Sequence, residues 1–248
     1  MTDDSRHAAA LRALAALDLT DLSDAATEAG LDSLCARAVT PHGAVAAVCV
    51  WPRFVARARL RLAGTSVRIA TVANFPAGGE DIAATRAEIA RNAADGADEI
   101  DVVLPWRAMR EGREGDARRL VDAARAATGG RALKVILETG ELADAASIAR
   151  AARLAIDAGA DFIKTSTGKT PVSATPQAAE TMLRAIKKSG RPVGFKASGG
   201  VRTLDDAQLY LALADRIMGA DWARPAHFRI GASGLLDALL VELGGARA

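Results

Sequence analysis

Three lysines and one aspartate stand inside short apolar segments, where charged side chains are uncommon. They are Asp101 in 99–104, Lys134 in 133–138, Lys164 in 162–165 and Lys196 in 193–196. A lysine that is buried beside another ammonium has a lowered pKa, and its neutral amine can then attack an aldehyde to form an imine. A carboxylate close by can move protons through water. These residue types together indicate aldol chemistry that proceeds through a lysine imine and needs no metal.

A structural ion-pair network or a metal site would account for these charges less well. An ion-pair network would need about as many carboxylates as lysines, and the four residues named above are three lysines and a single aspartate. A metal-dependent aldolase would need converging histidines and carboxylates. His7, His42 and His227 are far apart in the sequence, and neither Cys35 nor Cys49 stands in a metal-binding spacing. We therefore expect no metal and no cofactor.

The segments that carry these residues belong to a repeated pattern of an apolar run, a turn and an alanine-rich amphipathic helix. The expected strands are Ala46–Val50, Val67–Val72, Glu99–Leu104, Leu133–Glu138, Phe162–Thr165, Val193–Lys196, Arg216–Met218 and Phe228–Ile230. The expected helices are Arg53–Ala63, Asp81–Asp95, Glu114–Thr128, Ala143–Ala158, Pro176–Ser189 and Leu204–Leu213, with a last one starting near Gly234. Eight strands that alternate with helices predict an α/β fold of the (β/α)8 TIM-barrel type. An open doubly wound sheet is the runner-up, but no G-x-G-x-x-G loop follows the first strand.

Two further helices are expected before the first of these strands, at Ser5–Leu17 and Ser23–Ala38. The length of 248 residues suits one barrel domain. We therefore expect residues 1–248 to form a single TIM-barrel domain, with residues 1–40 as a helical extension packed on the barrel.

The alternation of side chains along each strand decides which residues face the barrel interior. In the segment 99–104 the apolar Ile100 and Val102 must face the helices, so Glu99 and Asp101 point inward. The same argument turns three lysines inward: Lys134, Lys164 and Lys196. We therefore expect four strands to bring Asp101 and the lysines into one interior.

Charge and composition exclude several classes of partner. The net charge is only +2, from 32 basic and 30 acidic residues that are mixed along the chain, so no footprint for nucleic acid or anionic lipid is present. Aromatic residues make up 4% of the chain, too few for a single-strand stacking surface. No apolar run reaches the length of a membrane span, and the chain opens with polar residues, so a cytoplasmic protein is expected.

Two glycine-rich stretches are suited to binding an anion. Ser198–Gly200 follows the sixth expected strand, and Gly231–Gly234 follows the eighth and opens the last helix. Glycine lets the backbone approach a ligand closely, and the N-terminus of a helix offers free N–H groups. Barrel enzymes often bind phosphate at the loops of the last strands. The two stretches together predict a phosphate site on the same end of the barrel as the lysines.

The chain resembles the deoxyribose-phosphate aldolases along nearly its whole length. The matching segments are Leu17–Thr20, Cys49–Phe54, Ala73–Pro76, Glu99–Val103, Lys134–Gly140, Phe162–Lys169, Gly194–Arg202 and Gly231–Ser233. The segment Phe162–Gly168, which reads F-I-K-T-S-T-G, is the most specific of them. One departure is Gly234, where some members have a second serine after Ser233.

The resemblance implies a lyase that reversibly cleaves 2-deoxy-D-ribose 5-phosphate to acetaldehyde and D-glyceraldehyde 3-phosphate, in deoxyribonucleotide breakdown. It implies that Lys164 forms the Schiff base, that Asp101 and Lys196 serve the proton transfers, and that Lys196 lowers the pKa of Lys164. The expected partners are therefore small molecules, a sugar phosphate and aldehydes, with no nucleic acid and no membrane. The alternative is another class I aldolase or a transaldolase-like lyase that acts on a sugar phosphate.

The resemblance also implies a set of substrate contacts. The substrate hydroxyls would be met by Thr167 and Lys169, and the phosphate by Gly199, Gly200 and Ser233. The expected binding site further includes Asp18 and Thr20 at its edge, together with Lys134 and Gly231.

Cys49 alternates with Val48 and Val50 on the first expected strand, so its thiol is a candidate reactive group that faces the site. A role as a small buried apolar residue fits the same pattern equally well. The sequence does not fix the oligomeric state, for which a homodimer is the candidate.

Overall fold

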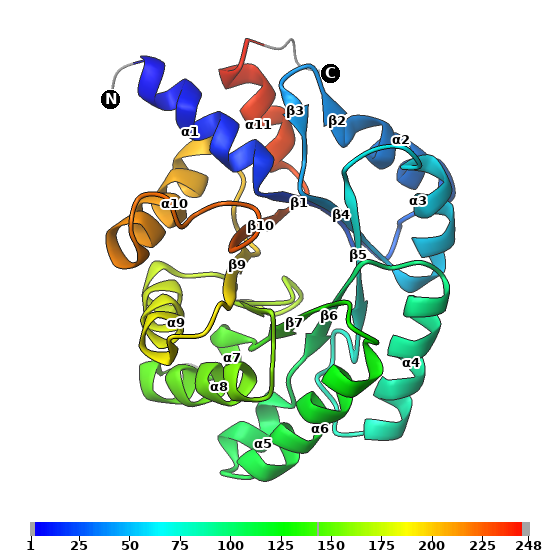
Figure 1. The fold of residues 1–248 in the computed structure, drawn as a ribbon, viewed down its shortest axis with the longest axis vertical. Helices are drawn as coiled ribbons and strands as arrows, with labels where there is room; N and C mark the ends of the chain where they lie inside the picture. Colours follow the sequence, from blue (N-terminus) through cyan, green and yellow to red (C-terminus); the bar gives the residue numbers. More distant parts are fainter. Residues whose placement is uncertain (1–2, 143, 245–248) are drawn as a thin grey trace.

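Eight parallel strands form a closed barrel in the computed structural model, which describes residues 3–142 and 144–244 (Figure 1). The barrel strands are β1 (Leu17–Asp21), β4 (Ala47–Val50), β5 (Arg68–Ala73), β6 (Glu99–Val103), β7 (Ala132–Ile136), β8 (Phe162–Lys164), β9 (Gly194–Ser198) and β10 (Phe228–Ala232). Consecutive barrel strands lie side by side, and β1 closes the ring by pairing with both β10 and β4. A short antiparallel pair, β2 (Val39–Thr40) and β3 (Gly43–Ala44), stands apart from the barrel. The predicted TIM barrel is confirmed.

Helices surround the barrel as an outer ring (Figure 1). They are α1 (Asp3–Ala15), α2 (Glu28–Arg37), η1 (Pro52–Phe54), α3 (Val55–Arg61), α4 (Ile82–Ala94), α5 (Trp106–Arg110), α6 (Glu114–Ala127), α7 (Thr139–Leu142), α8 (Ala145–Asp157), α9 (Pro176–Ser189), α10 (Leu204–Met218) and α11 (Leu235–Glu242). Ala143, where one helix was expected to begin, lies outside the described residues. Within residues 3–142 and 144–244, no helix has the length and apolar character needed to cross a bilayer.

Two of the expected elements were wrong. The segment Arg216–Met218, expected as a strand, is the last turn of α10, where Ile217 packs into the core. The segment Leu17–Asp21, expected as the end of one helix and the link to the next, is barrel strand β1, and α1 stops at Ala15. Residues 1–40 therefore supply a barrel strand and not only helices. The errors share a cause, because each segment is too short for its periodicity to distinguish a strand from a helix end.

The two faces of each strand meet different surroundings, as the alternation predicts. On β6, Ile100 and Val102 belong to the large apolar core between barrel and helices, while Glu99 and Asp101 are buried on the other face. A smaller apolar cluster lines part of the interior: Leu22, Ala47, Cys49, Ala70 and Val72. The interior thus has an apolar wall on β4 and β5 and a charged wall on the remaining strands.

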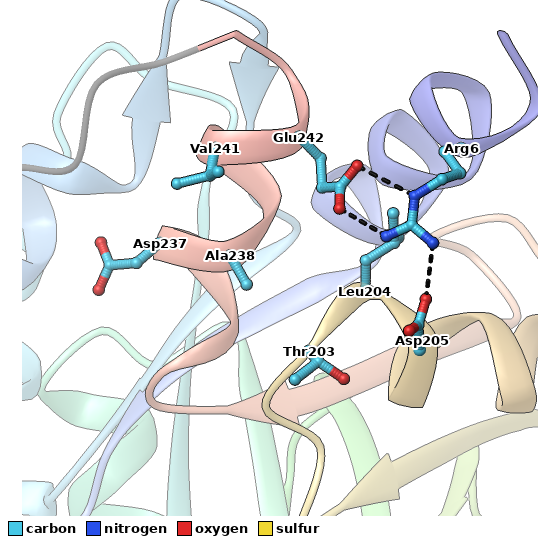
Figure 2. A pocket seen from close by; sticks show the side chains of 8 residues that line it. All are labelled: Arg6, Thr203, Leu204, Asp205, Asp237, Ala238, Val241 and Glu242. Atoms are coloured by element: carbon cyan, nitrogen blue, oxygen red, sulfur yellow. Dashed lines mark hydrogen bonds and ion pairs between the residues drawn. The ribbon is translucent and has the colours of Figure 1, made fainter. Parts of the chain in front are cut away.

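The helix α1 packs against α10 and α11 (Figure 2). Its Arg6 guanidinium bridges two helices, with Nη2 2.5 Å from Glu242 Oε1 and Nη1 2.8 Å from Asp205 Oδ1. Because these side chains are partly exposed, solvent screens both pairs and they contribute little to stability. The fully buried Leu14 and Ala13 hold the helix more firmly by removing apolar surface from water. This packing anchors the segment that leads into β1.

Candidate active site

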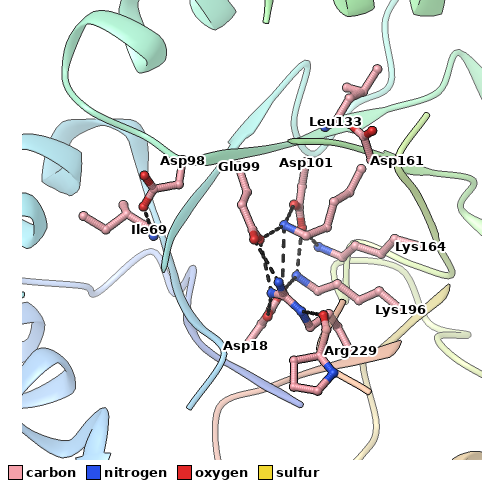
Figure 3. Close-up of polar contacts among 12 residues, drawn as sticks. Asp18, Ile69, Asp98, Glu99, Asp101, Leu133, Asp161, Lys164, Lys196 and Arg229 are labelled. Carbon is pink, nitrogen blue, oxygen red and sulfur yellow. Dashed lines mark hydrogen bonds and ion pairs between the residues drawn. The ribbon is translucent and has the colours of Figure 1, made fainter. Parts of the chain in front are cut away.

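The barrel interior brings together seven charged side chains of the described residues, linked to one another by ion pairs. They are Asp18, Glu99, Asp101, Lys134, Lys164, Lys196 and Arg229, and each is at most 6% exposed. They come from β1, β6, β7, β8, β9 and β10. Figure 3 shows six of them pointing toward a common centre, and Lys134 joins these six through its ion pairs with Glu99 and Asp101. Such a concentration of buried charge is expensive to desolvate and is more typical of a functional site than of a stabilising one.

Asp101 is the centre of this network. Its Oδ1 accepts a hydrogen bond from Lys134 Nζ at 2.8 Å, and its Oδ2 accepts from both Lys164 Nζ and Lys196 Nζ at 2.9 Å. Burial alone would raise the pKa of Asp101, but the charges of these three lysines outweigh it and hold the pKa well below its usual value. Asp101 is therefore an ionised carboxylate that accepts hydrogen bonds from all three lysine side chains.

A second layer of ion pairs lies on the side of the network toward the N-terminal ends of the strands. Arg229 donates from Nη1 to Asp18 Oδ1 at 2.7 Å and from Nη2 to Glu99 Oε1 at 2.9 Å. Lys134 Nζ is 2.6 Å from Glu99 Oε2, and Lys196 Nζ is 2.5 Å from Asp18 Oδ2. Both Lys134 and Lys196 consequently have a second carboxylate besides the one on Asp101.

The three lysines differ in their readiness to lose a proton. Burial by itself would lower the pKa of all three lysines. For Lys134 and Lys196 the neighbouring carboxylates more than reverse this effect, so the pKa of each is raised. For Lys164 the burial prevails over Asp101 and is reinforced by the charge of Lys196, so its pKa is lowered. Lys164 is the amine that becomes neutral most easily, and a neutral amine is the nucleophile that imine chemistry needs.

Two glycines create the space that these side chains occupy. A Cβ on Gly231 would lie 2.9 Å from Lys196 Cε and 2.8 Å from Ser198 Oγ. A Cβ on Gly194 would lie 2.3 Å from the Phe162 ring. These distances are shorter than real Cβ contacts, so only glycine fits at either position without a shift of its neighbours.

The predicted hydroxyl-binding residues follow β8 in a loop. The Thr167 amide donates to Glu138 Oε1 at 3.2 Å, and the Thr170 hydroxyl donates to the same oxygen at 3.3 Å. Lys169 Nζ lies 3.3 Å from Asp24 Oδ1 and 5.9 Å from the centre of the Trp51 ring. Glu138, which sequence reasoning did not include in the site, thus holds the loop in place. Burial raises the pKa of its carboxyl group.

The predicted phosphate residues lie on two adjacent strands and the loops that follow them. Ser198 of β9 pairs with Gly231 of β10, so the segments beyond them run side by side. Gly199 and Gly200 have φ of +87° and +85°, a region that L side chains rarely adopt. No atom beyond the chain neighbours lies within 4 Å of a Cβ built on Gly200, and Ser233 is exposed. An anion could reach the backbone N–H groups of both segments.

Thr20 and Cys49 face each other across the pair β1–β4. The Thr20 hydroxyl donates to a nearby carbonyl, Asp18 O, at 2.8 Å. Cys49 is fully buried in the small apolar cluster, and burial raises the pKa of its thiol, which keeps the thiol in its less reactive protonated form. The reactivity of Cys49 stays a prediction.

The histidines do not converge. His7 is exposed, His42 lies in the loop between β2 and β3, and His227 stacks on Trp222 with ring centres 5.9 Å apart. In the described part of the chain, no group of three or more histidine, cysteine, aspartate or glutamate side chains is arranged to hold a metal ion.

The structure changes one predicted location and adds Glu99 and Arg229 to the charged network, besides Glu138 in the loop. Asp18 lies fully buried in the network rather than at the edge of the site. Arg229, which sequence reasoning missed, is 6% exposed and contacts both Asp18 and Glu99. Its position between the apolar Phe228 and Ile230 was a usable signal, because alternation turns it inward.

Comparisons with known proteins agree with this arrangement. Residues 12–239 match a family model described as the DeoC/LacD family aldolase. A deoxyribose-phosphate aldolase from Agrobacterium fabrum is 52% identical over 242 residues, which cover 97% of this chain and 93% of that protein. A crystal structure from Toxoplasma gondii ME49, provisionally assigned as a deoxyribose-phosphate aldolase, has a TM-score of 0.89 at 27% identity and covers 97% of this chain and 98% of its own. A similarly assigned structure from Coccidioides immitis has a TM-score of 0.82 at 32% identity and covers 92% and 85%.

Proposed function

Since this chain belongs to the DeoC/LacD family of aldolases, we propose that it cleaves 2-deoxy-D-ribose 5-phosphate reversibly to acetaldehyde and D-glyceraldehyde 3-phosphate through an imine on Lys164. The observation that carries the proposal is the position of the Lys164 amine. It lies at the C-terminal end of β8, is 2% exposed, and has a lowered pKa beside a carboxylate and a second ammonium. Catalytic groups of barrel enzymes lie at this end of the strands.

The first half of the reaction forms the imine. The neutral amine of Lys164 attacks the aldehyde carbon C1 of the open-chain sugar, and the C1 oxygen takes up a proton. Loss of that oxygen as water leaves a protonated imine, whose C=N bond accepts electrons from the neighbouring carbons. Asp101 Oδ2, which contacts the amines of both Lys164 and Lys196, is placed to pass protons between Lys196 and the reacting oxygen.

The second half breaks the carbon skeleton. Removal of the proton from the C3 hydroxyl turns C3 into an aldehyde, the C2–C3 bond breaks, and its electron pair moves into the imine to give an enamine. D-glyceraldehyde 3-phosphate leaves at this point. A proton added at C2 restores an imine, and water hydrolyses it to acetaldehyde and the free Lys164 amine. We assign these proton transfers to Asp101 together with Lys196 and to a water molecule.

The remaining predicted residues would bind the substrate. The loop that Glu138 holds would offer Thr167 and Lys169 to the sugar hydroxyls, and the neighbouring segments after β9 and β10 would offer backbone N–H groups to the phosphate. The N-terminus of α11 adds a favourable dipole. In this proposal, the phosphate contacts are at Gly199, Gly200 and Ser233, and Gly231 belongs to the wider substrate site. A place in deoxyribonucleotide breakdown in the cytoplasm belongs to the same proposal.

The test combines product analysis with trapping. The protein would be incubated with 2-deoxy-D-ribose 5-phosphate, and the products identified by mass spectrometry. In a parallel sample, borohydride would be added with acetaldehyde, and the modified peptide sequenced. We expect the two named aldehydes and an N-ethyl group on Lys164. Other products would indicate a different class I aldolase or a transaldolase-like lyase, and a label on another lysine would overturn the assignment of Lys164.

A further inference from the structure

The seven linked charges of the barrel interior do not balance when all are ionised. Three are carboxylates, from Asp18, Glu99 and Asp101, and four are cations, from Lys134, Lys164, Lys196 and Arg229, among the residues that the structure describes. The sum is +1. It becomes zero when one lysine is neutral. A buried network with no net charge is favoured over one with an excess charge, because an uncompensated charge is poorly solvated there.

Arg229 is the cation of this network that does not become neutral. A guanidinium group stays protonated in proteins, whereas a buried lysine readily loses its proton. Arg229 is also firmly held, since Nε donates to Pro225 O at 2.6 Å and the guanidinium lies 5.5 Å from the centre of the Phe162 ring. Its two Nη atoms contact Asp18 and Glu99. Its positive charge therefore always offsets part of the carboxylate charge.

The geometry decides which lysine becomes neutral. Lys196 lies against Asp18 as well as Asp101, and Lys134 lies against Glu99 as well as Asp101. Among the carboxylates of the described chain, Lys164 has an ion pair only with Asp101, through an oxygen that it shares with Lys196. Loss of the proton from Lys164 therefore gives up the fewest ionic contacts.

We propose that Arg229 is a positioning residue for the reaction, whose fixed charge completes the neutralisation of Asp18, Glu99 and Asp101 and so leaves Lys164 as the lysine without a proton. The proposal rests on the function proposed above, in which Lys164 forms the imine. Arg229 would act on Lys164 only through the network, because its guanidinium does not contact Lys164. It contacts Asp18 Oδ1, whereas Lys196 contacts Asp18 Oδ2. The directions of the lysine pKa shifts agree with this proposal.

Further charged groups near the network stay outside its ion pairs. Arg68 of β5 and Arg131 line a recess at the N-terminal end of the barrel together with Arg229 and Glu99. Cys49 of β4 faces the lysines as a thiol whose pKa burial raises. Glu138 is buried beyond the C-terminal end of β7, where its carboxyl group accepts hydrogen bonds from Thr167 and Thr170. None of them forms an ion pair with a lysine of the network in the described residues.

The experiment measures how imine formation depends on pH in Arg229→Met and Arg229→Lys. The rate of borohydride trapping with acetaldehyde falls at low pH as Lys164 becomes protonated, and kcat/KM on the sugar phosphate reports the same ionisation of the free enzyme. Arg229→Met leaves three carboxylates to three lysines, so Lys164 should keep its proton to a higher pH. We expect the acidic limb of the pH profile, the range in which the trapping rate falls, to move upward by about one pH unit. Arg229→Lys keeps the charge and should restore most of the wild-type profile.

A change of opposite sign provides the matched control. Glu99→Gln removes one negative charge with little change of shape, so the acidic limb should move downward. The double variant with Glu99→Gln and Arg229→Met restores the balance and should return the limb close to the wild-type pH. If Arg229→Met does not fold, Glu99→Gln alone decides, since an unchanged limb in that variant overturns the proposal.

The outcomes separate the two proposals. Wild-type protein that gives no adduct on Lys164 contradicts the proposed function itself. Normal trapping on Lys164, with acidic limbs that stay at the wild-type pH in every folded variant, contradicts only the role of Arg229. In that case a lower kcat in Arg229→Met would reflect a structural defect.

Discussion

Lys164 and Lys196 donate hydrogen bonds to the same atom, Asp101 Oδ2, each at a distance of 2.9 Å. The two amino groups therefore compete for one acceptor. Lys196 has a further partner in Asp18, whereas Lys164 has no other carboxylate within ion-pair distance in the described chain. The same oxygen also connects the amine that would form the imine with the ammonium that would supply protons. The two lysines share one acceptor atom, and the additional partner of Lys196 is what distinguishes their roles.

Lys164→Arg should abolish turnover. A guanidinium cannot lose its proton and cannot form an imine, so kcat should fall by a factor of about 10⁴ or more. Steady-state kinetics on 2-deoxy-D-ribose 5-phosphate would measure the loss, with circular dichroism as the check on folding. Lys188→Arg, on the exposed side of α9, is the matched control and should behave as wild type. Substantial cleavage by Lys164→Arg would remove this lysine from the mechanism.

Lys196→Met should shift the pH dependence of imine formation. The pKa of Lys164 is lowered by burial and, beyond the opposing Asp101, by the charge of Lys196. Without that charge the pKa rises, Lys164 stays protonated to a higher pH, and the acidic limb of borohydride trapping moves upward. The rate of trapping as a function of pH is the measurement, and Lys187→Met on α9 is the control. A limb at the wild-type pH would mean that Lys196 does not influence Lys164.

Asp101→Asn should separate imine formation from the later proton transfers. The amine can still capture acetaldehyde, so borohydride trapping on Lys164 should persist. Exchange of the acetaldehyde methyl protons with D2O requires the enamine, and it should slow by a factor of about 10² because the carboxylate that moves the proton is gone. Proton NMR would follow the exchange. Equal loss of trapping and exchange would place the main contribution of Asp101 in imine formation instead.

Gly231→Ala should reduce activity for a steric reason. The new Cβ would lie 2.9 Å from Lys196 Cε and 2.8 Å from Ser198 Oγ, so both side chains must move. We expect a loss of stability of about 1–3 kcal/mol and a kcat lowered about 10-fold or more. Urea unfolding and steady-state kinetics would measure the two effects. Gly115→Ala is the control, because its Cβ would meet only Arg119 Nη1 at an ordinary 3.8 Å.

Ser233→Ala should weaken phosphate binding only modestly. In the proposed site most donors are backbone N–H groups, and Ser233 adds one hydroxyl, so KM for the phosphate ester should rise about 5-fold, equivalent to ~1 kcal/mol. The slow reaction with unphosphorylated deoxyribose should be unchanged, since that sugar lacks the group. Comparison of kcat/KM for the two sugars is the measurement. An equal loss on both would show that Ser233 does not contact the phosphate.

The sequence by itself determined the fold class and the charged interior. The alternation of apolar residues in 99–104 placed Asp101 inward, and the same pattern placed Lys134, Lys164 and Lys196 beside it. The structure places all four together at the predicted centre. This much is local information, since the period of two on each strand and the burial of its apolar face fix the orientation of every charged side chain.

Only the tertiary structure decided how the charges are paired. Leu17–Asp21 is too short and too mixed in character to be distinguished from a helix end, and it becomes a strand because its edges pair with β10 and β4 when the barrel closes. That closure brings Asp18 against Arg229, 211 residues away in the sequence. The partners of a buried charge depend on distances across the barrel, and no local pattern contains those distances. For this reason, the small number of carboxylate partners around Lys164 could be found only in the folded chain.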